Sequence, residues 1–307
     1  MIVDIYQLIN IPNRAMKPTA ALLLFLLPAI AFCQDPMAQN YKIYSTAKQR
    51  LATADELIAD LDKADVLFFG EEHNDSTGHY LESLLFKKIA DKYPGKAGLS
   101  MEMFQTDCQT VLNEYLADMI REKNLITEGR AWNNYKDYRP MIETAKAAHI
   151  PVVAANAPTR YTNMVTRGSL SSLDKLSPAA KGWLAPLPID TATGPYYEKF
   201  VTIMGGHSAM GNLKIYQSQN LWDATMGWNI AQFLKAHAGY KVFQVNGGFH
   251  SEEKLGTAAQ LKKYLPEVRI LNIQAYADDS FDNPDWSKFT KLGDYVILTN
   301  PKLAKTF

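Results

Sequence analysis

The chain has 307 residues, with 32 basic and 32 acidic side chains and 47% hydrophobic residues. A chain of this length and apolar content supports one large domain, or one domain with an insertion. The balanced charge argues against nucleic acid or an anionic membrane surface as the main partner.

The N-terminal residues 1–33 have the features of a secretory signal peptide. Lys17 precedes an apolar run over residues 20–27 that is too short to span a bilayer, and an Ala-x-Ala cleavage pattern follows at residues 29–31. We interpret residues 1–15 as a spurious upstream extension and Met16 as the working start of the signal. The sequence therefore predicts export to the periplasm or the cell envelope.

Because of Cys33, the sequence leaves open where the mature protein begins and whether it is lipidated. Cleavage after Ala31 or after Cys33 would release a protein without an anchor, whereas acylation of Cys33 would make a lipoprotein. A lipoprotein signal has a small residue before the cysteine, and Phe32 is bulky, so we disfavour lipid anchoring. If Cys33 is removed, Cys108 is the one remaining cysteine and no internal disulfide can form.

An apolar strand over residues 66–69 opens the main domain, which we place at residues 65–302. It follows a lead-in over residues 34–64 that includes a short helix with a capping box. After the strand come a Gly-x-x-His motif and a helix from about residue 78, whose N-terminal N–H groups point back at the motif. The polar residues at this strand end are Glu71, Glu72, His73 and His79.

Two further strands, over residues 97–103 and 151–155, also carry polar side chains at their ends. Helical spacing of apolar residues predicts helices over residues 108–122 and 139–149 between them. A buried carboxylate is costly unless it is paired or binds a ligand, although such a residue can also simply face solvent. The candidate site residues here are Glu102, Tyr138, Asn156 and Arg160.

The last third of the chain begins with an irregular insertion over about residues 168–213, rich in proline and glycine and containing His207. We expect a mainly helical insertion or lid. A long helix from residue 214 to 238 follows, and then a strand over residues 241–245 that ends in a second Gly-x-x-His motif with His250.

The alternation of strands and helices predicts an α/β protein with a largely parallel sheet flanked by helices. In such sheets, ligands bind beyond the carboxyl ends of the strands. We therefore expect the strand-end side chains to surround one shared pocket, in particular His73, Glu102, Arg160 and His250.

From about residue 65 to residue 274 these strand ends resemble the ChaN-like haem-binding proteins of the Tiki superfamily. The resemblance implies a bacterial envelope protein that binds haem for iron uptake, with a second copy of the chain and an outer-membrane receptor or uptake system as candidate partners. The wider superfamily also includes metal-dependent peptidases and erythromycin-esterase-like hydrolases. The residues that carry the resemblance are Gly70-Glu71-x-His73-Asn74-Asp75 with His79, Met101-Glu102-Met103-Phe104 with Asp107 and Gln109, Trp132 with Tyr138 and Pro140, Asn156-x-Pro158-x-Arg160, Gln219 with Asp223, and Asn246-Gly247-x-x-His250.

Two functions fit these residues. Haem needs an apolar slot, an axial ligand and donors for two propionates, and we expect Tyr138 or His207 as the axial ligand. The candidates for the haem site as a whole are His73, His79, Tyr138, Asn156, Arg160, His207 and His250.

The alternative is a metal-dependent hydrolase. Its divalent ion would be held by His73, Glu102 and His250, with Glu71 or Glu72 as the general base on a bound water. A non-catalytic binding domain, whose strand-end residues only satisfy one another, is the third interpretation. The resemblance favours haem binding, and whether the protein is an enzyme stays open.

Overall fold

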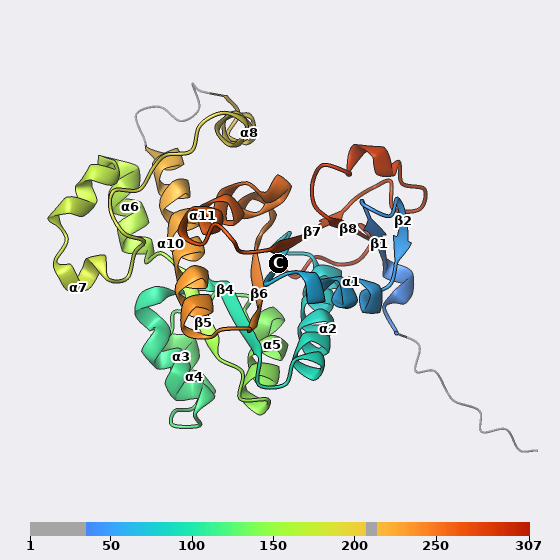
Figure 1. The fold of residues 1–307 in the computed structure, drawn as a ribbon, viewed down its shortest axis with the longest axis horizontal. Coiled ribbons are helices and arrows are strands. Elements are labelled where there is room, and N and C mark those ends of the chain that lie inside the picture. Colours follow the sequence, from blue (N-terminus) through green and yellow to red (C-terminus); the bar gives the residue numbers. More distant parts are fainter. Residues whose placement is uncertain (1–34, 207–213) are drawn as a thin grey trace, which may run out of the picture. The chain divides into compact units, whose positions relative to one another are not determined.

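A twisted sheet with strands in the order β2-β1-β8-β7-β3-β6-β4-β5 lies at the centre of the protein (Figure 1). The computed structural model describes residues 35–206 and 214–307. The predicted signal peptide and His207 lie outside the described residues. The strands are β1 (Tyr41–Ser45), β2 (Arg50–Ala52), β3 (Val66–Glu71), β4 (Ala97–Gln105), β5 (Val152–Asn156), β6 (Lys241–Gly247), β7 (Ile270–Ala277) and β8 (Tyr295–Thr299).

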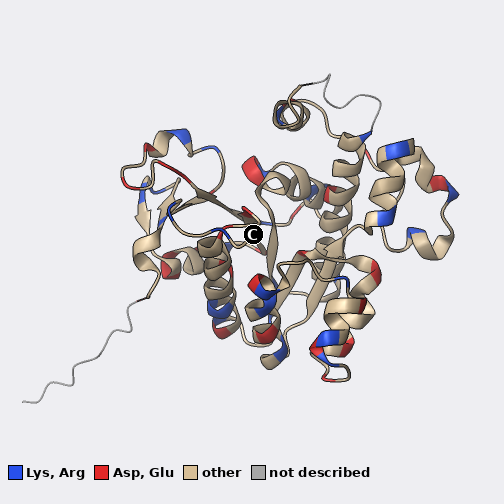
Figure 2. Ribbon diagram, turned by 180° about the vertical axis from the view of Figure 1, so that it is seen from behind, with Lys and Arg blue, Asp and Glu red and all other residues tan. Residues whose placement is uncertain are grey.

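Helices connect the strands and cover both faces of the sheet. None of the helices in the described part of the chain combines the length and apolar character needed to cross a membrane. Basic and acidic residues are interspersed along the helices (Figure 2), as the balanced composition leads one to expect. The α-helices are α1 (Ala54–Asp60), α2 (Ser76–Lys92), α3 (Gln109–Leu116), α4 (Glu122–Glu128), α5 (Tyr135–Ala147), α6 (Thr159–Gly168), α7 (Pro178–Lys181), α8 (Pro195–Ile203), α10 (Ile215–Ala236) and α11 (Gly256–Tyr264).

The predicted fold class is confirmed. The strands from β8 across to β5 pair in parallel, and in the described sheet β1 pairs antiparallel with both β2 and β8. Strands β3 and β6 are neighbours although they lie far apart in the sequence. Their register places Gly70 opposite Asn246 and Glu71 opposite Gly247, so the two Gly-x-x-His motifs begin side by side.

The alternation of side chains along β3 assigns its residues to two different cores. Leu67 and Phe69 pack with apolar residues of α2 and α5 on one face. Val66 and Phe68 pack with apolar residues of α10 and α11 on the other face. Both faces are covered, which explains why the strand is a continuous apolar run rather than an alternating one. Glu71 lies two residues after Phe69, so its side chain points to the same face of the sheet and faces α2 and α5.

Three elements differ from the sequence-based expectation. The polar lead-in contains β1 and β2, which extend the sheet beside β8, and Arg50 and Leu51 of the edge strand β2 are exposed. The helix expected over residues 108–122 is divided into α3 and α4, because the chain turns at Asp118 with φ of 58°. The third difference is helix α6, which follows β5 directly. The described part of the insertion, up to residue 206, contains the short helices α7 and α8.

Gly227 sets the distance between α10 and α11, the helices that lead to and from the second Gly-x-x-His motif. A Cβ atom there would lie 2.7 Å from the backbone nitrogen of Leu261 and 3.1 Å from the carbonyl carbon of Gln260. Backbone atoms cannot move aside as a side chain can. We expect Gly227→Ala to destabilise the protein by about 1–2 kcal/mol in urea unfolding, because overpacking outweighs the gain in helix propensity. Lys235→Ala, at an exposed position of α10, should change little, and an equally large loss there would contradict this explanation.

Candidate functional site

His73 lies just beyond the end of β3 and is fixed by hydrogen bonds. Its Nδ1 atom is 2.9 Å from Oε1 of Glu71, and its backbone oxygen accepts a hydrogen bond of 3.2 Å from the side-chain amide of Asn134. The ring of Trp132 contacts the imidazole edge to face, with 5.0 Å between ring centroids. The imidazole therefore has one nitrogen held by a carboxylate and one aromatic wall.

A cavity of about 360 Å³ opens beside His73, which we call the strand-end cavity. It combines the two Gly-x-x-His loops with apolar side chains from α8 and the residue after it. His73 is about 38% exposed, whereas Glu71 is buried beneath it. The lining includes Glu71, Glu72, His73, Phe200, Met204, Gln219, Gly247, Phe249 and His250.

Gly247 makes the close approach of His73 possible. A Cβ atom at Gly247 would lie 2.7 Å from Nε2 of His73, so any larger residue would displace the imidazole. Burial lowers the pKa of His73, but the hydrogen bond to Glu71 and the charge of Glu102 outweigh it and raise the pKa above its usual range. Burial raises the pKa of Glu71, but its hydrogen bonds to His73 and His79 outweigh burial and hold the pKa at about 2. Glu71 is thus an anion against the imidazole.

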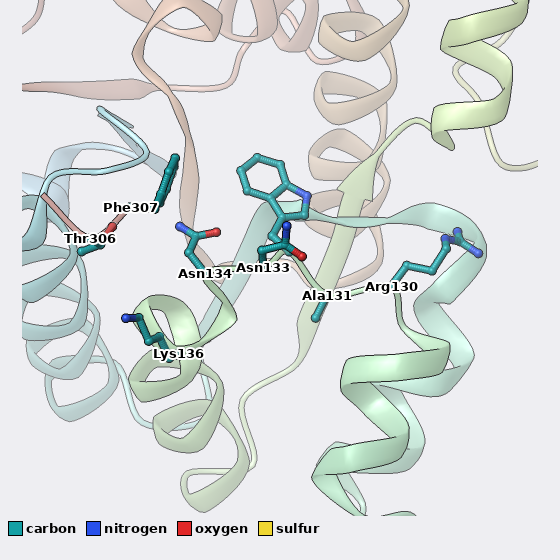
Figure 3. A pocket seen from close by; sticks show the side chains of 8 residues that line it. Arg130, Ala131, Asn133, Asn134, Lys136, Thr306 and Phe307 are labelled. Carbon is teal, nitrogen blue, oxygen red and sulfur yellow. The ribbon is translucent and has the colours of Figure 1, made fainter.

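A second cavity of about 540 Å³ lies on the other side of Trp132 and is shown in Figure 3. We call it the outer cavity. Because Trp132 lines it and also contacts His73, the two cavities lie next to each other. The outer cavity brings together aromatic, amide and cationic side chains, namely Arg130, Trp132, Asn133, Asn134, Lys136 and Phe307.

His250, from the second motif, is held between two carboxylates. Its Nδ1 atom lies 2.7 Å from Oδ1 of Asp223 and its Nε2 atom lies 3.4 Å from Oε1 of Glu102. The other oxygen of Glu102 accepts the backbone N–H of Gly247 at 2.7 Å. Burial lowers the pKa of His250, but the charges of Glu102 and Asp223 outweigh it and raise the pKa to about 10. At neutral pH this histidine is an imidazolium.

The structure brings some of the predicted site residues together and separates others. His73, Glu102 and His250 converge at the ends of β3, β4 and β6. Arg160 does not line the strand-end cavity: it pairs with Asp107 and stacks on Tyr161. Asn156 is buried and accepts the backbone N–H of Ala157.

The other predicted residues lie around Glu71 or at the surface. The buried hydroxyl of Tyr138 donates to Oε1 of Glu71 at 2.9 Å, and its ring packs against His79. His79 is itself buried. Glu72 lines the strand-end cavity and pairs with Lys305 at 3.2 Å.

Two carboxylates of the site are absent from the residues chosen by sequence. Asp223, on α10, holds His250, and Glu82, on α2, is fully buried near Glu71. The sequence could have identified Glu82, because it lies three residues after His79 and hence on the same helix face. Asp223 belongs to the residues that carry the family resemblance, but no local pattern indicates that it pairs with His250.

Comparison with known proteins identifies the family and the fold of the chain. The profile of the haem-binding uptake family, Tiki superfamily, ChaN, matches residues 57–261. Among solved structures, a ChaN of Campylobacter jejuni, described as showing cofacial haem binding, superposes with a TM-score of 0.65 at 17% identity, covering 86% of this chain and 98% of that one.

Two further solved structures are more distant. The type III effector HopBA1 has a TM-score of 0.45 at 13% identity and covers 80% of this chain and 93% of its own. An erythromycin esterase has a TM-score of 0.46 at 10% identity and covers 85% and 83%. Among curated protein sequences, none matches this chain. The family match spans β3, β4, β5 and β6 and both Gly-x-x-His motifs, and the chain therefore belongs to the haem-binding uptake family of the Tiki superfamily, ChaN.

Proposed function

We propose that this protein binds haem in iron uptake, that the strand-end cavity is the haem site and that His73 is the axial ligand. The observation that carries the proposal is the position of the His73 imidazole and the hydrogen bond that fixes it. Its Nδ1 atom is held by Glu71, it is partly exposed, and Nε2 lies against Gly247, which lines the same cavity. A carboxylate on one nitrogen fixes the orientation of a histidine ligand and raises its basicity.

The surroundings of His73 fit a haem group. Haem needs a mainly apolar slot with one nitrogen, oxygen or sulfur donor to the iron. Phe200, Met204 and Phe249 provide apolar walls of the strand-end cavity, and Trp132 lies on the side of the outer cavity. Lys136 lines the outer cavity, where a cation suits a propionate. When bound, haem would supply an iron centre that takes the imidazole nitrogen.

Tyr138, favoured from the sequence, is less suited to be the ligand in this conformation. Its hydroxyl is buried and donates to Glu71, so Glu71 and His73 stand between it and the strand-end cavity. Burial, together with the charge of Glu71, raises the pKa of Tyr138 well above its usual range, which opposes formation of the phenolate.

Titration of the protein with haem, followed in the Soret region, tests the proposal, and a saturable change is the supporting result.

We do not propose the metal-dependent hydrolase. In this conformation both ring nitrogens of His250 face carboxylates, Nδ1 facing Asp223 at 2.7 Å and Nε2 facing Glu102 at 3.4 Å. Among the described residues, the three that come within coordinating distance of one another do not include His73, Glu102 or His250.

We also propose that the mature protein is exported, as the apolar run before Cys33 indicates. Mass spectrometry of the protein from cells should show a mature start near Phe32 or Gln34. Acylated Cys33 would establish a lipoprotein, and an intact N-terminus in the mature protein would contradict export. A homodimer and an outer-membrane receptor or uptake system stay predictions, and the oligomeric state can be measured with and without haem by sedimentation.

A further inference from the structure

A second group of ionisable side chains lies behind β3, on the side of α2 and α5. It consists of Glu71 at the end of β3 and of His79 and Glu82 on α2, all of them buried. Each offers one ligand atom, and these atoms lie within 4.8 Å of one another. Glu71 uses Oε1 toward His73 and Tyr138, which leaves Oε2 for this group.

The polar atoms of this group are only partly satisfied by one another. Nε2 of His79 pairs with Oε2 of Glu71 at 3.0 Å. Nδ1 of His79 and both carboxylate oxygens of Glu82 have no hydrogen-bond partner among the described residues. Such a set of buried, unpartnered donors and acceptors is costly. The three ligand atoms, which lie within 4.8 Å of one another, have a spacing that suits ligands around a common centre.

The charge of the group points in the same direction. Asp75 and Asp137 lie near Glu82, and Oδ2 of Asp137 is 3.9 Å from Nδ1 of His79. Buried carboxylates require a compensating cation or a proton. A proton on Glu82 would remove one charge but would leave Nδ1 of His79 without a hydrogen-bond partner.

We propose that Glu71, His79 and Glu82 form a binding site for one divalent first-row metal ion. One imidazole and two carboxylates suit zinc, manganese or ferrous iron. Asp137 is the positioning residue, because its Oδ2 atom lies 3.9 Å from Nδ1 of His79 and lacks a hydrogen-bond partner among the described residues. A carboxylate behind a ligating histidine fixes the ring orientation. This site is separate from the triplet His73, Glu102 and His250.

The test uses the full mature chain, stripped with a chelator and titrated separately with Zn²⁺ and Mn²⁺ against a competing chromophoric chelator. Wild type should bind about one ion per chain, and Glu82→Gln, which keeps the side-chain volume but removes a charged ligand, should lose that binding. Asp137→Asn should bind roughly 10- to 100-fold more weakly. Zn²⁺ should raise the melting temperature of wild type and leave that of Glu82→Gln unchanged.

Glu102→Gln separates this site from the other buried carboxylate–histidine group, and it should keep the ion. Loss of the ion in Glu102→Gln with retention in Glu82→Gln would overturn the proposal. So would a wild type that binds neither ion while Glu82→Gln unfolds at the same or a higher temperature, because that result identifies Glu82 as a protonated carboxyl. The proposal does not depend on haem binding, since the titration is carried out without haem.

Discussion

Haem added to the wild-type protein is expected to give a saturable Soret change, and His73→Ala is expected to abolish it. The substitution removes the partly exposed imidazole of the strand-end cavity and one of the hydrogen-bond partners of Glu71. Loss of an outer-sphere partner alone costs 10–100-fold in metal affinity, so loss of the ligand should weaken haem binding by more than about 100-fold. Titration followed by absorbance, at constant pH, measures this effect.

Tyr138→Phe is the matched comparison for this experiment. It removes the hydroxyl that donates to Glu71 but leaves the packing of the ring against His79. If His73 is the axial ligand, Tyr138→Phe should keep the Soret change with at most a modest loss of affinity. Haem binding that survives His73→Ala and is lost in Tyr138→Phe would show that the tyrosine is the ligand, and that the pocket rearranges when haem enters.

Asp223→Asn is expected to cause the largest loss of stability in the site region. Oδ1 of Asp223 accepts hydrogen bonds from His250 and Thr257, and Oδ2 accepts one of 2.5 Å from Tyr196. The substitution breaks the shorter of the two buried ion pairs of His250 and leaves Glu102 as its remaining carboxylate. Breaking a buried ion pair costs about 3–5 kcal/mol. The melting temperature should fall by roughly 10 °C, at the 2–4 °C per kcal/mol typical of chains near this size. Asp174→Asn, at an exposed position, should change it little.

The pH dependence of stability distinguishes a charged from a neutral His250. Its pKa rises from 6.5 to about 10 in the folded protein, so its contribution is complete below about pH 6.5 and is lost as the pH rises toward 10. Wild type should therefore lose stability across this range more steeply than Asp223→Asn, in which the pKa of His250 is closer to its ordinary value. Equal slopes for the two proteins would mean that His250 is not held as an imidazolium.

The sheet is readable from the sequence because its central strands are buried on both faces. Val66 to Phe69 form an apolar run that ends at Gly70, and the second motif repeats this pattern, so strand ends and polar loops coincide. Strands β1 and β2 were not predicted, because they are short, lie in a polar stretch of the sequence and end the sheet at β2, where Arg50 and Leu51 are exposed. The parallel sheet accounts for why His73 and His250 meet in one cavity.

The partners of the site residues are less accessible to sequence reasoning. The strand end marks His250 as a site residue, but the carboxylate that holds it comes from the middle of α10, where Asp223 has an ordinary helical environment in sequence. Arg160 follows a strand end like the others, yet the nearby Asp107 pairs with it outside the cavity. Spacing along the chain identifies strand ends, whereas pairing between elements is decided by their packing.

The pairing of β3 with β6 also determines when the site can form during folding. Glu71 and Gly247 are opposite each other in the sheet, but nearly the whole of the domain separates them along the chain. Contacts of such long sequence separation form late, because the entropy of closing the loop must first be overcome. The strand-end cavity therefore does not exist on a nascent chain or on an N-terminal fragment that stops before β6. A chain that crosses a membrane unfolded would acquire its haem-binding competence only after the whole sheet has assembled on the far side.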